Sequence, residues 1–434
     1  MKPVNLPVQN QAPRTDVLFL YRTKKKKRYF NLLKDQSLNT LNCQVQSYHG
    51  LPIAPSVSLS EQVLQQIVHK AELELYNAKS ESWQRVKLLA RPILIGQIKL
   101  LYSRLFHYLI NSAPKLVVIW NGHKWQDNVF HAVNYHFGIA VSYFENGVLP
   151  QSTTMDFNGI NALNSVPREA HFYDSLVSKN VASNFTIKGR KYKQHKNTQI
   201  SFKRPKKYLL VPFQKDRDSQ ILDNSSWIKS MSQLFQVLTE ALEMSHREDL
   251  HIVFREHPSA KTRYTTLYKL AAKHPRLCFD QQSELSEIIT HAEAVITINS
   301  TVGLESLLLG TKVITLGEAF YNIASMVLEA RSVPALSQHI NTLENFSVNP
   351  HRLKRFIEYL QNEYVIPGDW KKPGELHYET IQTRILNHLD HLKTADNQCV
   401  KEHRNSLTRL KNPKNRLNQI LSNLSAVINF SVIN

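Results

Sequence analysis

Two polar motifs follow predicted buried strands in the second half of the chain. The sequence FREHP places His257 and Pro258 after one apolar run, and ITINST places Ser300 and Thr301 after another. The carboxyl ends of parallel strands meet along one edge of an open α/β sheet, where such sheets bind ligands. N–H and hydroxyl groups at a helix N-terminus favour an anion, to which a nearby histidine can also donate. The spacing therefore predicts a cradle for a phosphate or a nucleotide.

Each motif also has an ordinary structural explanation. Asn-Ser-Thr before a helix caps that helix, and His-Pro ends a strand in a turn. The two motifs follow strands of the same predicted sheet, which favours the binding-site interpretation over two unrelated turns.

A glutamate occupies the corresponding position in the first half of the chain. The predicted strand 140–144 leads directly into Glu145, Asn146 and Gly147, so the carboxylate lies at the carboxyl end of a strand. A half-buried glutamate there can act as a general acid or base at neutral pH. The alternative is that Glu145 only helps to form the turn.

The first loop of the second domain is crowded with polar residues. It follows a predicted strand at 207–213 and precedes a helix predicted to run to about Met244. An aspartate in this loop can face Glu145 across a cleft between the domains, or it can cap the helix, as Asp218 and Asp223 both can. The polar residues at the start of the loop are Gln214, Asp216, Asp218 and Gln220.

These motifs resemble the capsule polysaccharide biosynthesis family, whose members include retaining β-Kdo transferases of capsules exported by ABC transporters. The resemblance covers residues 116–322 and is carried by FREHP, HAEAVITINSTVGLESLLLGTKVITLGEAFYNI and the earlier FENGVLPQSTTMDFNGINALNSVPR. It implies an α/β, GT-B-like fold of two facing Rossmann-like domains with parallel sheets and C-terminal crossing helices. It also implies CMP-Kdo as the donor substrate, with no metal and no other cofactor.

The resemblance assigns roles to individual residues. Asp218 corresponds to the proposed nucleophile, with Asp216 as the alternative, and Glu145 lies in the Glu-Asn-Gly turn of the active centre. The nucleotide is expected to contact His257, Pro258, Asn299, Ser300, Thr301 and Glu305, the last placed to meet the ribose. The substrates are expected to contact Asn146, Gln214, Gln220 and Arg255.

The function that this resemblance implies is a glycosyltransferase of capsular polysaccharide biosynthesis. It would move Kdo from CMP-Kdo, with retention, to a lipid or a Kdo-terminated acceptor. The nucleotide sugar, a glycolipid or lysophospholipid acceptor and the capsule export machinery are the implied partners. Two alternatives stay open: a GT-B transferase that uses another CMP-sugar of the sialic acid type, and a non-catalytic scaffold for capsule assembly or export.

The composition indicates an acidic partner and a reducing compartment. The 434 residues contain 54 Lys and Arg against 35 Asp and Glu, a formal net charge of +19, which suits an anionic membrane surface or polyanionic substrates. No nucleic-acid-binding motif accompanies the basic runs, so nucleic acid is not an expected partner. The three cysteines are scattered and lack the spacing of a metal site or a disulfide framework.

We expect a cytoplasmic protein, peripheral on the inner face of the bacterial cytoplasmic membrane. The start of the chain has no signal-peptide pattern, and no apolar run reaches the roughly 18–20 residues of a membrane span. Two basic segments can face anionic groups. One is the run RTKKKKR at 22–28, and the other is RPILIGQIKLLYSRLFHYLI, the second part of a helical pattern at 60–110 that is predicted to break at Pro92. The alternatives are a solvated helix start and a helix packed on its own sheet.

Alternation of strands and helices predicts two Rossmann-like domains separated by a polar, basic linker at 179–206. The first is the acceptor domain and the second binds the nucleotide sugar, after which helices cross back to the first. The predicted regions are a disordered N-terminus at 1–15, the two domains at 16–200 and 201–370, crossing helices at 371–395, and a tail at 396–434 that is basic and amphipathic or disordered.

Overall fold

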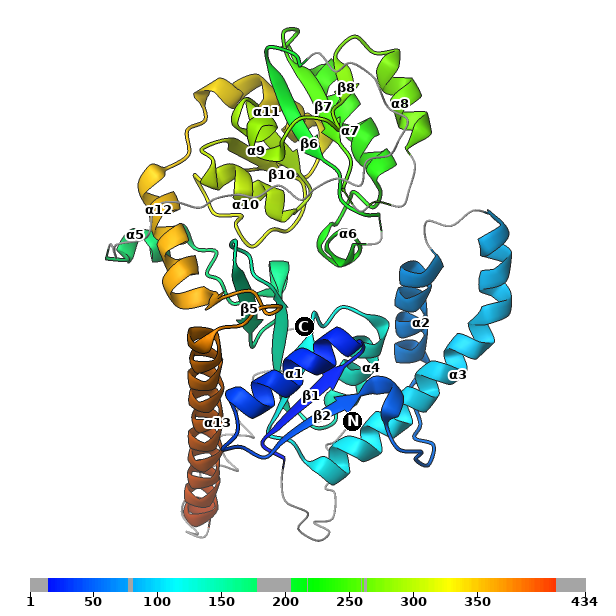
Figure 1. Ribbon diagram of the computed structural model, residues 1–434, viewed down its shortest axis with the longest axis vertical. Coiled ribbons are helices and arrows are strands. Elements are labelled where there is room, and N and C mark those ends of the chain that lie inside the picture. The colour runs from blue at the N-terminus through cyan, green and yellow to red at the C-terminus, as the bar shows by residue number, and fades with distance from the viewer. Residues whose placement is uncertain are drawn as a thin grey trace, which may run out of the picture. The chain divides into compact units, whose positions relative to one another are not determined.

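The computed structural model describes residues 15–76, 81–177, 204–216, 218–258, 260 and 264–410. The chain divides into two compact units, with the boundary between His377 and Tyr378. Both β-sheets belong to the first unit (Figure 1).

The first sheet forms from short apolar segments. Two central strands read VLFLY and LVVIW, and such continuous runs are typical of a sheet that is covered on both faces. The strands β1 to β4 pair in parallel, whereas β5 and β12 pair antiparallel at one edge. The order is β12-β5-β4-β3-β1-β2, with β1 Val17–Tyr21, β2 Cys43–Ser47, β3 Leu116–Trp120, β4 Ala140–Asn146, β5 Ser152–Asp156 and β12 Ile366–Pro367.

The second sheet is built from parallel pairs with a crossover at its centre. The predicted α/β class, with two Rossmann-like sheets, is therefore confirmed. The order is β11-β10-β9-β6-β7-β8, with β6 Tyr208–Pro212, β7 His251–Arg255, β8 Leu277–Phe279, β9 Ala294–Thr297, β10 Lys312–Thr315 and β11 Leu328–Glu329.

Helix α3 (Glu81–Ser112) contradicts the break predicted at Pro92. Proline lacks the N–H of a helix interior and usually kinks or ends it. Pro92 lies on the exposed side of α3, where water can satisfy the freed carbonyl, while Leu94, Ile98 and Leu105 are buried in the core. Packing of that buried face compensates for the local cost of the proline, so the helix continues past Pro92. The other helices in this part of the chain are α1 Lys24–Gln36, α2 Glu61–Tyr76, α4 Trp125–Asn134 and α5 Ala170–Ser175.

The single helix predicted to run to Met244 is two helices in the structure. The carbonyl of Asn224 at the end of α6 accepts from the Glu318 N–H and from the Asn299 side chain, and α7 starts anew with Ser230 as its N-cap. Because these contacts use the end of α6, the chain turns there. The helices from this point are α6 Ser219–Asn224, α7 Met231–Met244, α8 Thr265–Ala272, α9 Leu285–Thr290, α10 Thr301–Leu308, α11 Val333–Thr342, α12 Pro350–Tyr359 and α13 Glu375–Leu410.

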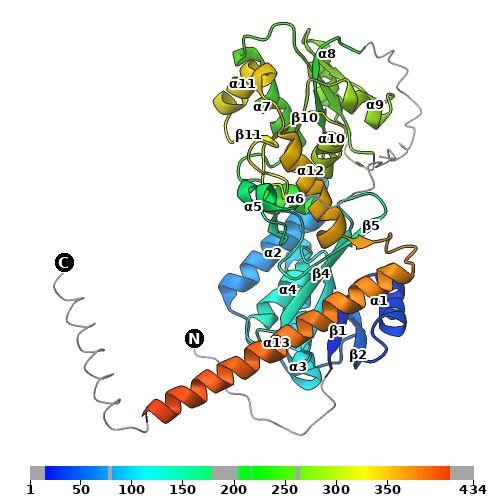
Figure 2. The same cartoon turned by 90° about the vertical axis from the view of Figure 1, so that its left-hand side faces the viewer.

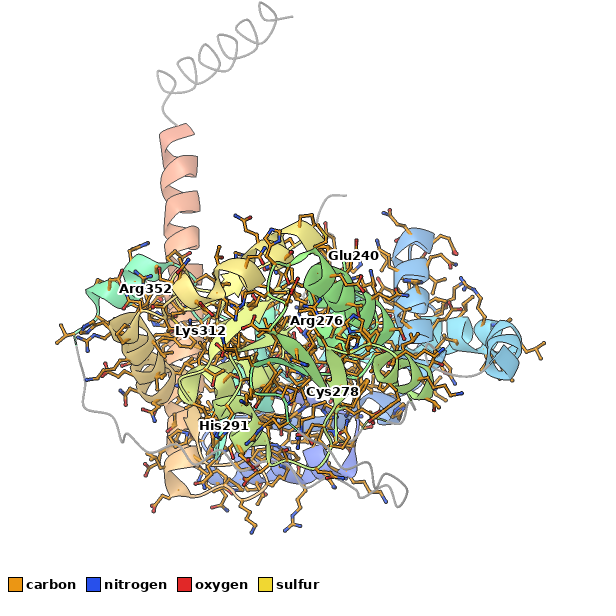
Figure 3. The ribbon with its side chains drawn as sticks, turned by 90° about the horizontal axis from the view of Figure 1, so that it is seen from above. Glu240, Arg276, Cys278, His291, Lys312 and Arg352 are labelled. Atoms are coloured by element: carbon orange, nitrogen blue, oxygen red, sulfur yellow. The ribbon has the colours of Figure 1, made fainter. Side chains whose placement is uncertain are left out.

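After the second sheet the chain returns to the first through α12. Helix α12 packs on α5, where the rings of Phe356 and Tyr173 have centroids 5.5 Å apart (Figure 2). Arg352, labelled in Figure 3, donates to both carboxylate oxygens of Asp174 at 3.0 and 2.7 Å. Strand β12 then pairs with β5. This return precedes the segment 371–395, where crossing helices were predicted and where α13 begins.

Three predicted segments lie partly or mainly outside the described residues. They are residues 1–14 of the predicted disordered N-terminus, most of the predicted linker, and residues 411–434 of the tail. Within the described ranges, no helix combines the length and the apolar composition that crossing a bilayer requires.

The first turn of α10 packs against Tyr321 and leaves no room for a side chain at Gly303. A Cβ at that position would overlap with the Tyr321 hydroxyl group. That hydroxyl donates to the carbonyl of Ser300. The glycine therefore permits the close approach that fixes the loop in front of α10.

Gly303→Ala is expected to lower the free energy of unfolding by about 1–3 kcal/mol, the usual cost of overpacking a core. Gly96→Ala is the matched control, because no atom lies within 4 Å of a Cβ at Gly96 and alanine is favoured over glycine in a helix by about 1 kcal/mol. Urea unfolding followed by circular dichroism measures both changes. Equal stability of the two variants would contradict the packing account.

Candidate functional site

Asp218 is held at the start of α6 with one carboxylate oxygen in use. Its Oδ1 accepts the backbone N–H of Gln220 at 3.1 Å, which makes Asp218 the N-cap of α6. The capping interpretation of the sequence is therefore correct. Among the described residues, Asp218 Oδ2 has no hydrogen-bond partner. The hydrogen bond to Oδ1 orients the half-buried carboxylate, and Oδ2 can still bind a ligand.

Asp216, the alternative nucleophile, has both oxygens occupied. They accept the backbone N–H of Met231 at 2.7 Å and the hydroxyl of Tyr264 at 2.8 Å. Asp216 therefore ties the loop after β6 to the starts of α7 and α8. This difference favours Asp218 as the aspartate that can react.

Glu145 lies in a strand rather than in the predicted turn. β4 continues through Asn146 because β5 pairs with it antiparallel, with Glu145 opposite Thr154. Glu145 Oε2 accepts from the Asn121 side chain at 2.8 Å. Glu145 Oε1 accepts from the backbone and the side chain of Asn146 at 2.9 and 2.6 Å. These donors hold the carboxylate as a hydrogen-bond acceptor at the end of β4.

The turn that presents Asn121 uses two consecutive left-handed residues. Asn121 has a φ of 74° and Gly122 a φ of 80°, a conformation that asparagine and glycine adopt more readily than other residues. A Cβ on Gly122 would also lie 2.6 Å from Tyr143 Cδ1. The Asn-Gly pair is therefore needed to aim the Asn121 side chain at Glu145.

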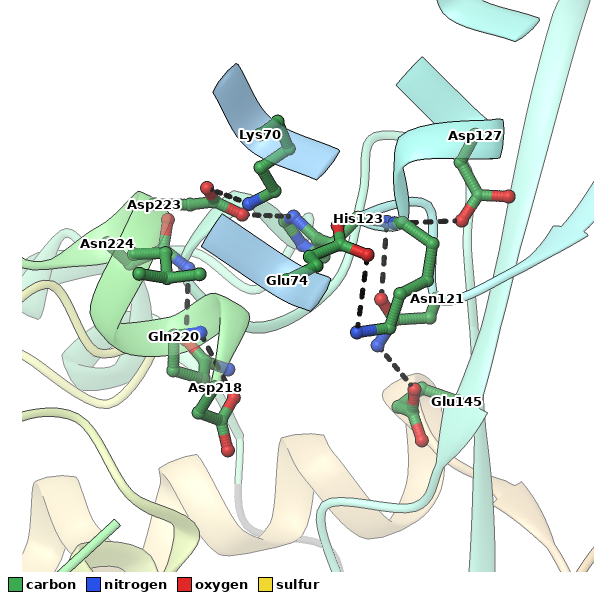
Figure 4. A network of polar contacts seen from close by, with 12 residues as sticks. Lys70, Glu74, Asn121, His123, Asp127, Glu145, Asp218, Gln220, Asp223 and Asn224 are labelled. Carbon is green, nitrogen blue, oxygen red and sulfur yellow. Dashed lines mark hydrogen bonds and ion pairs between the residues drawn. The ribbon is translucent and has the colours of Figure 1, made fainter. Parts of the chain in front are cut away.

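A polar network connects the elements that carry the two acids (Figure 4). His123 Nδ1 lies 3.0 Å from a carboxylate oxygen of Asp223 on α6. The His123 N–H donates to Asn121 Oδ1 at 3.2 Å, and Asn121 in turn donates to Glu145. Asp218 caps the same short helix that carries Asp223. Within the described residues, Asp218 and Glu145 do not contact each other directly.

Asp223 is the charged centre of this network. Burial raises its pKa, but hydrogen bonds and charges from His123 and Lys70 outweigh burial, so the pKa lies below its ordinary value. The ion pair therefore stabilises the fold at pH values above the ordinary aspartate pKa. That stabilisation is lost as the pH falls through the depressed value of the folded state.

Three predicted ligand contacts make side-chain hydrogen bonds within the protein: Gln214, Gln220 and Asn299. The Gln214 side chain donates to Asn299 Oδ1 at 3.1 Å, and Asn299 Nδ2 donates to the carbonyls of Gln220 and Asn224 on α6. The Gln220 side chain accepts from Asn224 at 2.9 Å. Gln214 and Asn299 are each only 5% exposed. Their amides therefore fasten α6 to the edge of the second sheet.

Arg255, another predicted substrate contact, points into the interior. It is 4% exposed, and its Nη1 lies 3.9 Å from Oδ2 of Asp280, a residue with no exposed surface. This ion pair connects the end of β7 to the residue that follows β8. The described residues contain no group of three or more His, Cys, Asp or Glu side chains placed to hold a metal ion.

Ser300 and Thr301 begin α10 as predicted, but they differ in what they can offer a ligand. Ser300 Oγ accepts the Val302 N–H at 3.2 Å, and the Ser300 N–H donates to Thr297 Oγ1 at 3.2 Å. Thr301 is exposed, and its N–H and hydroxyl have no hydrogen-bond partner in the described part of the chain. An anion can therefore accept hydrogen bonds from the N–H and hydroxyl of Thr301, and the helix dipole attracts it to the same position. Glu305 lies one turn further along α10.

His257 and Ser300 follow strands that are not neighbours. The order β9-β6-β7 puts one strand between those that lead to Ser300 and to His257. Neighbouring strands are about 4.8 Å apart, so the two strand ends are roughly 10 Å apart. His257 and Pro258 are half-buried in their loop. Of the two ligands that the motifs predicted, a whole nucleotide spans this separation more readily than a single phosphate.

The structure assembles an aromatic and basic cluster that the sequence pattern does not reveal. Lys26, in the first turn of α1, places its Nζ against the indole rings of Trp120 and Trp370, whose centroids are 4.8 Å apart. Trp370 Nε1 donates to Asn146 Oδ1 at 2.8 Å, and Asn146 also donates to Glu145. Asn146, a predicted substrate contact, therefore positions Glu145 and Trp370. Only the run of lysines at 24–27 gave a sequence signal here.

Residues 177–335 match the model of a family described as capsule polysaccharide biosynthesis protein. The matched segment contains Asp218, His257 and Ser300. Over this segment the chain is similar to the capsule polysaccharide biosynthesis family. The resemblance carried by the sequence motifs is thereby confirmed.

Curated relatives match over longer stretches. Protein FixF of Sinorhizobium fredii is 32% identical over 272 residues, which are 63% of this chain and 64% of that protein. Capsule polysaccharide export protein KpsS of Escherichia coli is 23% identical over 44% of this chain and 64% of its own length. The chain thus spans 64% of each relative, slightly under two thirds.

Among solved structures, the KpsC beta Kdo 2,7 transferase of Thermosulfurimonas dismutans aligns with 79% of this chain and 89% of its own. The two sequences are 15% identical there, and the TM-score is 0.41.

Asp223→Asn is expected to lower the free energy of unfolding by about 2 kcal/mol at pH 7, because it weakens charge-assisted contacts with His123 and Lys70. The difference from the unchanged protein should shrink toward pH 3, where the carboxylate itself takes up a proton. Urea unfolding at a series of pH values measures this.

The control is Asp35→Asn, at an exposed carboxylate of α1 without an ion pair in the described part of the chain. It should change stability by less than about 0.5 kcal/mol. A loss in Asp223→Asn that stays constant from pH 7 to pH 3 would contradict the ion-pair account.

Proposed function

We propose that the protein is a glycosyltransferase of capsular polysaccharide biosynthesis that transfers Kdo from CMP-Kdo, with retention, to a lipid or a Kdo-terminated acceptor. One observation carries the proposal. A carboxylate from each sheet, Asp218 after β6 and Glu145 in β4, lies at a carboxyl strand end, and the Asn121–His123–Asp223 network connects their elements. The match to the family model and the motif resemblance support the choice of donor.

Asp218 is the proposed nucleophile. Its open Oδ2 attacks the anomeric carbon of the sugar, and a carbon–oxygen bond to the enzyme forms as the carbon–oxygen bond to CMP breaks. CMP leaves with the electron pair as a phosphate monoester. The hydrogen bond from the Gln220 N–H to Oδ1 orients the carboxylate for this attack.

Glu145 is the proposed general base of the second step. It takes the proton of the acceptor hydroxyl as that oxygen attacks the anomeric carbon and displaces Asp218. Two inversions at one carbon give net retention. The hydrogen bonds from Asn121 and Asn146 orient the Glu145 carboxylate for this step.

The nucleotide is proposed to lie along the edge of the second sheet, from the start of α10 to the loop after β7. Thr301 and the dipole of α10 meet the charge that develops on the leaving phosphate. His257 and Pro258 contact the far part of the nucleotide, and Glu305 faces the ribose. Fixed N–H and O–H donors stabilise the leaving group in this scheme, and no metal ion or other cofactor enters it.

The proposed location is the inner face of the bacterial cytoplasmic membrane, reached through α3. Leu89, Ile93 and Leu100 are 81%, 66% and 46% exposed and recur on α3 at helical spacing. The helix carries five basic residues and one acidic residue. An apolar stripe beside cations suits an anionic lipid surface, where a lipid-linked acceptor is presented.

Asp218→Asn is expected to reduce transfer by about 10³-fold or more, because an amide does not form the glycosyl ester, while the affinity for CMP changes by no more than about twofold. Glu240→Gln, at an exposed carboxylate of α7 (Figure 3), is the control and should keep full activity. Product formation with a lipid acceptor measures transfer, and isothermal titration calorimetry measures CMP binding.

The same assay separates the candidate functions when the donor is varied. Product from CMP-Kdo supports the proposal. Product from CMP-sialic acid alone would show that the protein uses a different CMP-sugar as its donor. CMP binding without turnover in the unchanged protein would favour a scaffold. Unchanged turnover in Asp218→Asn would remove Asp218 as the nucleophile.

Leu89→Glu combined with Ile93→Glu is expected to weaken binding to anionic lipid vesicles at least tenfold, because it places charge on the apolar stripe of α3. Leu270→Glu is the control, since Leu270 is an apolar residue of α8 with 48% exposure. Vesicle co-sedimentation measures binding, and circular dichroism checks folding. Equal binding of both variants and the unchanged protein would remove α3 as the contact surface.

A further inference from the structure

The Lys26 amino group lies at the carboxyl end of β3, where Trp120 ends the strand. Its Nζ lies against the rings of Trp120 and Trp370, 3.2 Å from the ring centroid of the latter. Among the described residues, this Nζ makes no hydrogen bond and no ion pair. Aromatic faces attract a cation, but they leave its three N–H donors free for an anion.

The groups around Lys26 are fixed by bonds of their own. Arg22 donates to the Trp120 carbonyl at 3.0 Å and also contacts Asp127, whose carboxylate is fully buried. Asp127 accepts the Tyr48 hydroxyl at 3.0 Å. Trp120 is therefore anchored through its backbone, just as Trp370 is anchored through Asn146. A site whose walls are held in this way loses little entropy when a ligand binds.

The protonated form of Lys26 is disfavoured mainly by burial. Burial lowers the pKa of Lys26 to about 6, and Lys371 and Arg22 act in the same direction, while Glu145 and Asp369 oppose the shift. An anion beside Nζ adds an opposite charge and raises this pKa again. An anion that binds here near neutral pH is therefore accompanied by a proton.

We propose that Lys26, Trp120 and Trp370 form a binding site for an anionic group of the acceptor, a carboxylate or a phosphate, and that Lys26 takes up a proton when this group binds. The ring or chain that carries the anion lies on the half-buried indole of Trp370. Asn146 joins Trp370 to Glu145, so an acceptor held here has its hydroxyl groups near the proposed base. The identification of the ligand as the acceptor rests on the proposed function, whereas the anion-binding site itself does not.

Isothermal titration calorimetry on the full chain, with no donor present, tests the site. The probes are free Kdo, which carries a carboxylate on a sugar ring, glycerophosphoglycerol, which carries the phosphodiester of a lipid headgroup, and neutral glucose. Both anionic probes keep a constant charge between pH 6 and pH 8. We expect at least one of them to bind at least tenfold more tightly than glucose, and the tighter one names the source of the anion.

The affinity for the anionic probe should fall by up to about 50-fold from pH 6 to pH 8, as a group with a pKa near 6 loses its proton. Titrations in two buffers of different ionisation enthalpy should show uptake of up to one proton. Affinity that does not change with pH would overturn the proposal.

Three lysine variants make the assignment specific. Lys26→Met should weaken anion binding at least tenfold. Lys26→Arg should keep the binding but lose its pH dependence, because a guanidinium stays charged throughout this range. Lys25→Met, at the exposed neighbour in the same run, is the control and should behave like the unchanged protein. Anion binding that survives in Lys26→Met would overturn the proposal.

The outcomes also separate this inference from the proposed function. Anion binding that depends on Lys26 in a protein that transfers no sugar would leave the site standing and remove the transferase. Sugar transfer by a protein whose anion binding does not depend on Lys26 would remove this site alone.

Discussion

The proposed active centre depends on the contacts that the Asp223 carboxylate makes with two cationic side chains. It meets His123 from the loop after β3 and Lys70 from α2, while Asn299 holds the same helix to the second sheet. Helix α6 has six residues, too few to be stable by helix propensity alone. Its place is therefore set by side-chain bonds from both sheets. The position of Asp218, which caps this helix, follows from those bonds.

Three aspartates within one loop and one short helix have different roles because their hydrogen-bond partners differ. Asp216 uses both oxygens to hold neighbouring elements, and Asp223 is paired with cations. Asp218 caps a helix with one oxygen and leaves the other open. The structural and the catalytic interpretations of Asp218 are therefore compatible, because the cap supplies the orientation that a nucleophile needs. The same holds for Glu145, whose amide partners fix its carboxylate.

The sequence predicted what depends on local pattern, and it missed what depends on distant partners. Buried apolar runs predicted the strands correctly. The polar residues that follow these runs lie at the carboxyl ends of the strands, as predicted. The sequence did not show that Gln214 and Asn299, two predicted ligand contacts, are buried and that their amides bond to each other. The helix break at Pro92 was wrong because tertiary packing outweighs the local cost of proline. The contact of Lys26 with Trp370 joins the start of the chain to a late segment, which no local pattern encodes.

The central claim is that Asp218 forms a covalent bond with the sugar. Glu145→Gln should slow the second step, so the glycosyl-enzyme should accumulate when this variant is mixed with CMP-Kdo. Intact-mass and peptide mass spectrometry of the quenched mixture test this most directly. The account predicts one added Kdo residue on the peptide that contains Asp218. The absence of any adduct while CMP is released, or an adduct on a peptide without Asp218, would contradict it.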